Sequence, residues 1–117
     1  MITRRLFITA APIALAACAM QGVPARARTT VIMVRHADRA GNVLNSTGRA
    51  RAAALPGLLQ EYTLDAIYSP DIARNLETAE PLSQATGLPV TIIPRENAGA
   101  RMTSDFPKGA VIWVGNK

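Results

Sequence analysis

Short apolar runs alternate with polar, glycine-bearing segments along the chain after residue 28. Four of these runs contain β-branched residues, three of them in the majority, and have the length of buried strands. They span residues 30–34, 64–68, 89–93 and 110–114. Apolar positions at helical spacing fill the stretches between the first three runs. This alternation predicts an α/β domain of three α/β/α layers, in which helices cover both faces of a mainly parallel sheet.

Residues that are typical of helix starts and helix ends mark the two expected helices. The first helix is expected to begin with Ser46 or Thr47 as its N-cap and to kink or break at Pro56. Ser69-Pro70-Asp71 suits the start of the second helix, because it combines a hydroxyl, a proline and a carboxylate. Gly87 is expected to end that helix, and the segment before the last strand is expected to be a loop.

The first 27 residues have the composition of an export signal and are excluded from the fold. Arg4 and Arg5 precede an almost wholly apolar segment, Leu6–Met20. That segment has 15 residues, fewer than the ~20 that a helix needs to span a bilayer. Thr3–Ile8 also resembles a twin-arginine export signal. The sequence therefore predicts an exported, periplasmic protein.

Two cleavage positions compete in this segment. Leu15–Cys18 resembles a bacterial lipobox, in which Cys18 would carry a lipid and attach the protein to a membrane. Ala25–Ala27 instead fits the small-x-small pattern of ordinary signal cleavage. We favour the lipobox, because the only cysteine of the chain stands at the position that lipidation requires.

Residues 28–117 are long enough for one modest core but not for two domains. No cysteine follows Cys18, so this part has no disulfide. Eleven basic and eight acidic side chains follow Cys18, and the arginines are scattered with few aromatic residues between them. This is not the basic, aromatic-rich pattern of a nucleic-acid-binding surface. A small excess of positive charge suits a small anionic ligand instead.

Reactive and charged side chains stand where the strand runs end. Arg35 and His36, the only histidine of the chain, directly follow the first run. Ligands of parallel α/β sheets bind beyond the carboxyl ends of the strands, and a guanidinium beside an imidazole suits phosphate. Arg74 stands near the start of the second helix, whose N-terminus adds backbone donors. The sequence therefore predicts that these three side chains form a phosphate cradle.

The predicted cradle suggests a particular chemistry. A neutral imidazole can attack phosphorus and form a phosphohistidine, while arginines bind the phosphoryl oxygens. We therefore expect a small phosphorylated substrate, or phosphate itself, as the ligand. His36 has no second imidazole or thiol partner after residue 28, so neither a metal centre nor another cofactor is expected.

Three segments of the chain resemble the histidine phosphatase superfamily, which includes phosphoglycerate mutases and acid phosphatases. These segments are Val31–Asp38, Thr47–Ala52 and Tyr68–Ala79. The resemblance extends over about residues 29–115 and implies a phosphoglycerate mutase-like fold. It also implies that His36 is the nucleophile that becomes phosphorylated, and that Arg35 and Arg74 bind the phosphate.

The same resemblance suggests three further site residues. Asn42 stands where mutase-like members place an asparagine, and Arg39 where acid phosphatases place another arginine. Both are candidates for phosphate contacts. Glu96 follows the third strand and is a candidate general acid for the leaving group, although we favour its interpretation as a solvated loop carboxylate.

The chain also departs from the family pattern. Ala37 replaces the usual glycine, which requires a negative φ at this position. Asn116 stands where the family places a second catalytic histidine, and Lys117 follows. The chain thus resembles a C-terminally truncated member, incomplete at that end, and apolar residues of the last strand such as Val111 and Trp113 are expected to be exposed. Two hypotheses remain: a phosphatase weakened by the missing histidine, or a non-catalytic phosphate-binding remnant.

Overall fold

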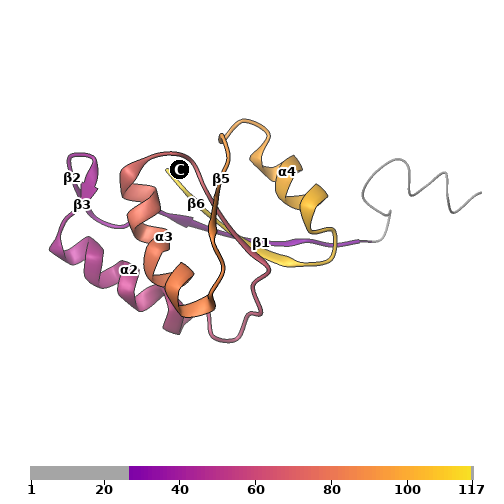
Figure 1. Cartoon of the computed structure of the whole chain (residues 1–117), viewed down its shortest axis with the longest axis horizontal. Coiled ribbons are helices and arrows are strands. Elements are labelled where there is room, and N and C mark those ends of the chain that lie inside the picture. Colours follow the sequence, from indigo (N-terminus) through magenta and orange to yellow (C-terminus); the bar gives the residue numbers. More distant parts are fainter. Residues whose placement is uncertain (1–26, 117) are drawn as a thin grey trace, which may run out of the picture.

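The computed structural model describes residues 27–116 and contains one parallel sheet of four strands, in the order β1-β6-β4-β5 (Figure 1). The strands are β1 (Thr30–Arg35), β4 (Ala66–Ser69), β5 (Val90–Ile92) and β6 (Ala110–Gly115). A small antiparallel hairpin, β2 (Arg39–Ala40) and β3 (Val43–Leu44), follows β1. All four strands lie where β-branched runs predicted them, and the parallel sheet is confirmed.

Helices cover both faces of this sheet. Helices α2 (Ser46–Leu58) and α3 (Ala73–Thr86) lie on one face, and α4 (Ala98–Asp105) lies on the other (Figure 1). Successive residues of β6 point to opposite faces. Ile112 accordingly packs with buried residues of α3, whereas Val111 packs with buried residues of α4. The expected three-layer α/β/α architecture is confirmed.

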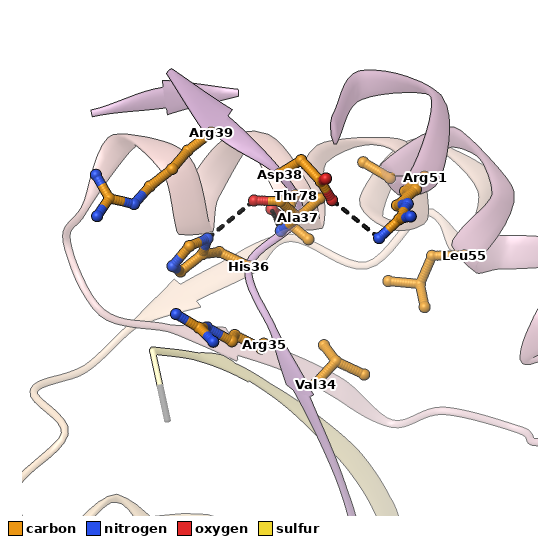
Figure 2. A pocket seen from close by; sticks show the side chains of 10 residues that line it. Val34, Arg35, His36, Ala37, Asp38, Arg39, Arg51, Leu55 and Thr78 are labelled. Carbon is orange, nitrogen blue, oxygen red and sulfur yellow. Dashed lines mark hydrogen bonds and ion pairs between the residues drawn. The ribbon is translucent and has the colours of Figure 1, made fainter. Parts of the chain in front are cut away.

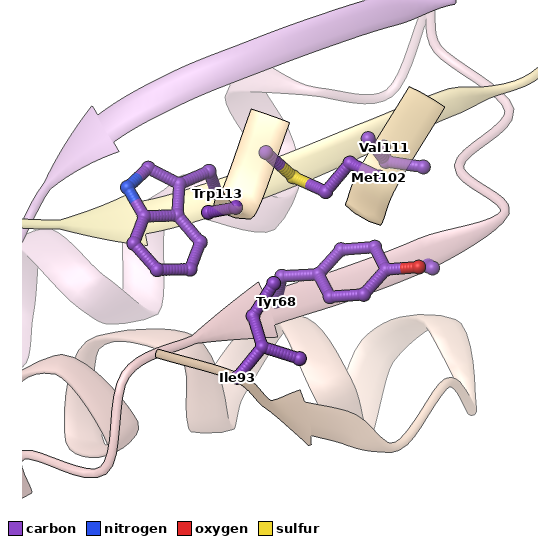
Figure 3. Packing of buried hydrophobic residues seen from close by; sticks show 7 residues of the cluster. Tyr68, Ile93, Met102, Val111 and Trp113 are labelled. Carbon is purple, nitrogen blue, oxygen red and sulfur yellow. The ribbon is translucent and has the colours of Figure 1, made fainter. Parts of the chain in front are cut away.

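The helix α4 occupies a segment that the sequence led us to expect as a loop, so that prediction was wrong. Its buried residues are only Ala98 and Met102, four positions apart, and Phe106 just beyond the helix extends their spacing. Two buried residues are too few for a visible helical period. Figure 3 shows how Met102 packs against Val111, Trp113 and Tyr68 of the sheet.

Because α4 covers this face, the residues of β6 are buried. Val111 is 0% exposed and Trp113 is 6% exposed. The expectation that these side chains would be exposed is therefore wrong. A helix of eight residues is enough to shield the two central strands, β6 and β4, on this side of the sheet.

The start of α2 differs from the prediction. Its N-cap is Asn45 and not Ser46 or Thr47, and the Asn45 side chain accepts a hydrogen bond of 2.8 Å from the Gly48 backbone N–H. The helix also continues through Pro56 without a break. Pro56 lacks only one backbone donor and stands two residues before the helix ends, so its cost is confined to the last turn.

The start of α3 also differs from the prediction, whereas its end agrees. Ser69 is the last residue of β4, and its hydroxyl donates to the Pro70 carbonyl instead of capping a helix. The chain makes a tight turn in which the Ile72 N–H donates to the same carbonyl, and α3 begins after it. Gly87 ends α3 in the left-handed conformation with φ of 77°, as expected.

Residues 1–26, which include most of the expected export signal and Cys18, lie outside the described residues, as does Lys117. Export and lipid attachment therefore stay predictions. Within residues 27–116, none of the helices combines the length and the apolar character needed to cross a membrane.

A hydrogen-bonded group of three side chains joins α4 to the sheet. The buried Tyr68 hydroxyl donates to Asp105 Oδ2 over 2.8 Å, and Arg101 Nε donates to the same oxygen over 2.8 Å. Burial, together with the bond to the Asp105 carboxylate, raises the pKa of Tyr68 to about 12. The bonds from Tyr68 and Arg101 lower the pKa of the Asp105 carboxyl below its usual value.

We predict that Tyr68→Phe lowers the free energy of unfolding by about 1 kcal/mol at neutral pH, because Asp105 loses a donor. The pKa of Tyr68 is raised by folding, so this contribution is fully present below pH 10 and is lost as the pH rises through about 12. Urea denaturation at several pH values measures the difference. The matched control is Tyr62→Phe, at an exposed tyrosine. Curves of wild type and Tyr68→Phe that stay parallel between pH 10 and 12 would contradict the prediction.

Candidate functional site

The carboxyl ends of β1, β6 and β4 lie side by side, because β6 pairs with both other strands. The His36 backbone N–H donates to the Gly115 carbonyl over 3.0 Å and so extends the β1–β6 pairing by one residue. Arg74 Nη2 donates to Asn116 Oδ1 over 3.4 Å. The loops that follow the three strands therefore meet at one edge of the sheet, as the sequence led us to expect.

Arg74 is the second residue of α3 and is half-buried at this edge. Its Nη1 donates to Asn42 Oδ1 over 3.0 Å, and its Nε is buried without a hydrogen-bond partner. Among residues 27–116, no carboxylate forms an ion pair with Arg74. A half-buried guanidinium that is held by neutral amides and not by a carboxylate can bind the oxygens of an anion.

His36 is half-buried and follows the last residue of β1. Its ring Nδ1 lies 2.9 Å from the Ala37 carbonyl oxygen (Figure 2). A carbonyl oxygen only accepts hydrogen bonds, so this contact places the proton of the neutral ring on Nδ1. The lone pair is then on Nε2, which is the atom available for attack on an electrophile.

Bonds to two helices hold the loop that carries His36. The Ala37 N–H donates to Thr78 Oγ1 over 3.0 Å, and the Thr78 hydroxyl donates to the Arg74 carbonyl over 2.7 Å. Asp38 forms an ion pair of 3.0 Å with Arg51 of α2. Ala37 has a negative φ, as required for a residue that replaces glycine. The nucleophile candidate is thus positioned by α3 as well as by its own strand.

A cavity of about 540 Å³ lies beside this loop. Arg35, His36 and Arg39 line one side of it, and the apolar side chains of Val34 and Leu55 line the opposite side (Figure 2). Arg35 and Arg39 are exposed, and neither forms an ion pair with a carboxylate within the described part of the chain. The cavity therefore has a positively charged wall beside the imidazole.

The structure brings most of the expected site residues together, but not all of them. Arg35, His36 and Arg39 line one cavity. Arg74 does not line that cavity and is held beside it by Asn42 and Asn116. Glu96 does not line that cavity but lines another one together with Asn116, and its side chain is 71% exposed and contacts Arg95 over 3.4 Å. In the segment 27–116 no three His, Cys, Asp or Glu side chains are grouped as metal ligands would be.

Three residues that position the site were missed in the sequence. Thr78 lies one helical turn after Arg74, so the spacing could have indicated that both residues face the same side of the helix. Asn75 is fully buried, and its Nδ2 donates to the Val114 carbonyl over 3.0 Å, which fixes α3 against the end of β6. Asn116 was noted only as a replacement for histidine, whereas it orients Arg74. The bonds of Asn75 and Asn116 depend on tertiary contacts that no sequence period indicates.

Gly48 permits a close approach between α2 and the loop of His36. A Cβ atom at Gly48 would lie 1.9 Å from the Asp38 carbonyl oxygen, which is far inside contact distance. That same carbonyl accepts a hydrogen bond from the Asn45 N–H over 3.0 Å. The backbone of the site is therefore packed directly against the first turn of α2.

We predict that Gly48→Ala displaces the loop of His36, lowers the free energy of unfolding by about 1–3 kcal/mol and weakens binding of inorganic phosphate. The matched control is Gly57→Ala in the same helix, where a Cβ meets no atom within 4 Å. That change is expected to raise stability by roughly 0.5–1 kcal/mol. Thermal melts and calorimetric phosphate titrations measure both effects, and equal behaviour of the two variants would contradict the close packing.

Solved structures with a similar fold include two phosphatases. The chain is similar to a protein assigned as the phosphohistidine phosphatase SixA from Agrobacterium tumefaciens, with a TM-score of 0.63, 24% identity, and coverage of 74% of this chain and 66% of that one. It is also similar to a mycobacterial glucosyl-3-phosphoglycerate phosphatase, with a TM-score of 0.58, 19% identity, and coverage of 74% and 73%. The chain thus spans about two thirds of the length of the SixA protein.

Two comparisons of the sequence itself give different results. The comparison with curated proteins finds no match. The family model of the histidine phosphatase superfamily (branch 1) matches residues 25–96, which is more than half of the chain and includes Arg35, His36 and Arg74. This chain belongs to the histidine phosphatase superfamily.

Proposed function

We propose that this protein hydrolyses a small phosphomonoester through a phosphohistidine formed on His36. Two side chains carry this proposal. No carboxylate in residues 27–116 neutralises the charge of Arg74, and the Nε2 atom of His36 is free to attack phosphorus. His36 directly after β1 and Arg74 in the first turn of α3 lie at the same edge of the sheet. Family membership and the phosphatase neighbours support the same activity.

Binding of the phosphate group follows from the charges of the site. Arg74 Nε is an unpartnered donor, and the exposed Arg35 guanidinium stands beside the imidazole. Together they would bind the non-bridging oxygens of the phosphoryl group and stabilise the charge that spreads over them in the transition state. Asn42 and Asn116 hold Arg74 in place through their side-chain oxygens.

The reaction would proceed in two steps. The Nε2 lone pair attacks phosphorus, the bond to the leaving oxygen breaks, and that oxygen takes a proton from water. The bond from Nδ1–H to the Ala37 carbonyl stabilises the positive charge that the ring acquires. Water then attacks the phosphohistidine, which releases phosphate and restores the imidazole. We assign Glu96 no part in these steps, because its side chain is largely exposed and contacts Arg95.

We propose that turnover by this chain is weak. Asn116 follows β6 at the place where the family resemblance implies a second histidine, and it offers a neutral amide to the site. Loss of one preorganised donor to a developing oxyanion costs on the order of 10²–10³ in rate. The second candidate function is phosphate binding without catalysis, and the neutral side chain of Asn116 favours it as well.

We predict that an aryl phosphate labelled on phosphorus transfers label to the protein, and that His36→Ala abolishes both the transfer and the turnover. Phosphohistidine is lost in acid and survives in alkali, so the stability of the label identifies the residue type. Lys108→Ala, which changes a charge outside the site, serves as the control. Phosphate binding without any label or turnover would favour the non-catalytic candidate.

We also predict that Asn116→His raises turnover by on the order of 10²-fold, because it restores an imidazole donor beside Arg74. Asn116→Ala is the matched comparison and is expected to lower turnover, since Arg74 loses one of its two orienting oxygens. Steady-state kinetics with one aryl phosphate distinguish the three proteins. A histidine variant no faster than wild type would show that Asn116 does not limit the rate.

A further inference from the structure

The two outer strands of the sheet differ in how well their free edges are protected. At one side, β5 has three residues and stands between Pro89 and Pro94. Short strands and prolines are common means of protecting a sheet edge from further pairing. At the other side, β1 has six residues, and residues 27–36 contain neither proline nor lysine. In the described part of the chain β1 pairs with β6 alone, so its other edge is open.

Every second residue of β1 directs its backbone N–H and C=O groups away from β6. The N–H groups of Thr30 and His36 donate to carbonyls at the two ends of β6. Because this direction alternates along a strand, Val31, Met33 and Arg35 present their backbone groups at the open edge. A row of unpaired donors and acceptors of this kind is a template for pairing with another strand.

An exposed apolar side chain stands at the middle of this edge. Met33 is 68% exposed. It lies on the same face of the sheet as Val31, which packs against the buried residues under α4. That helix covers the central strands β6 and β4 and leaves Met33 open to solvent. A partner that pairs with the edge of β1 would therefore also remove apolar surface from water.

A second copy of β1 fits this edge in the antiparallel direction, about a two-fold axis perpendicular to the sheet. Such pairing has to bring outward-directed residues opposite one another and keep each side chain on its own face. A pairing centred on Met33 meets both conditions. Met33 then lies opposite Met33 of the second copy, and Val31 lies opposite Arg35. Each of these pairs exchanges two backbone hydrogen bonds, and the same surface serves both copies.

The charges of the two copies are compatible in this arrangement. Arg35 faces the neutral Val31, so no like charges lie opposite one another. The exposed Arg28 precedes β1, and the same spacing brings it beside the loop that carries Asp38 of the second copy. Opposite charges would thus meet at both ends of the paired strands, which favours this register.

We infer that two copies of this chain associate as a symmetric dimer, in which their β1 strands pair antiparallel and join the two sheets into one. A contact between two strands is smaller than the ~1,200–2,000 Å² of standard interfaces, so the dimer is expected to dissociate on dilution. The inference does not depend on the proposed phosphatase activity.

Sedimentation velocity of the full chain at increasing protein concentration measures this association. Met33→Lys and Met33→Glu each place two like charges opposite one another on the axis. We expect either variant alone to weaken the association at least about tenfold. An equimolar mixture of the two variants is expected to restore it, because the mixed dimer has opposite charges on the axis.

The matched control is Ile92→Lys, which adds the same charge at an exposed position of the protected edge strand β5 and is expected to leave the association unchanged. Because Met33 is exposed, both of its variants are expected to keep the melting temperature of the wild type when measured as monomers. A wild-type chain that stays monomeric at every concentration would overturn the inference. Association that is equally strong in Met33→Lys, or a mixture that associates no more than its separate components, would overturn it as well.

Discussion

The central place of β6 is the constraint on which the site depends. This strand pairs with β1 on one side and with β4 on the other, and Val111, Ile112 and Val114 within it are completely buried. His36 and Arg74 belong to segments that are far apart in the sequence, and this double pairing places the ends of their segments at one edge of the sheet. The hydrogen bond from His36 to Gly115 shows that the pairing extends into the site itself.

The electrostatic design of the site uses neutral groups to orient a charge. Carboxylates commonly orient buried arginines, but they also neutralise them. Here two asparagine oxygens hold the Arg74 guanidinium, and its Nε stays unpartnered. Two arginines paired with carboxylates have structural roles instead: Arg51 holds the loop of His36 through Asp38, and Arg101 joins the group of Tyr68 and Asp105.

Strand runs in the sequence predicted the sheet and the place of the site, whereas prediction failed where few or distant contacts decide the structure. The four strands were predicted from apolar runs, and the meeting of the segments that carry His36 and Arg74 at one sheet edge was predicted from the rule that ligands lie at the carboxyl ends of parallel strands. The helix α4 was missed, because two buried residues give no visible period. The caps at Asn45 and Ile72 and the partners of Arg74 were missed, because turns and tertiary contacts determine them.

The bond from Asn75 to the Val114 carbonyl has a mechanical consequence. It fixes the helix that carries Arg74 to a deeply buried strand, so this wall of the site is held firmly. The opposite support, Asn42, belongs to the short exposed hairpin β2–β3. A ligand bound at Arg74 would therefore have a firmly held helix on one side and an exposed hairpin on the other. Changes in the position of the Arg74 side chain on binding would come from the hairpin rather than from the helix.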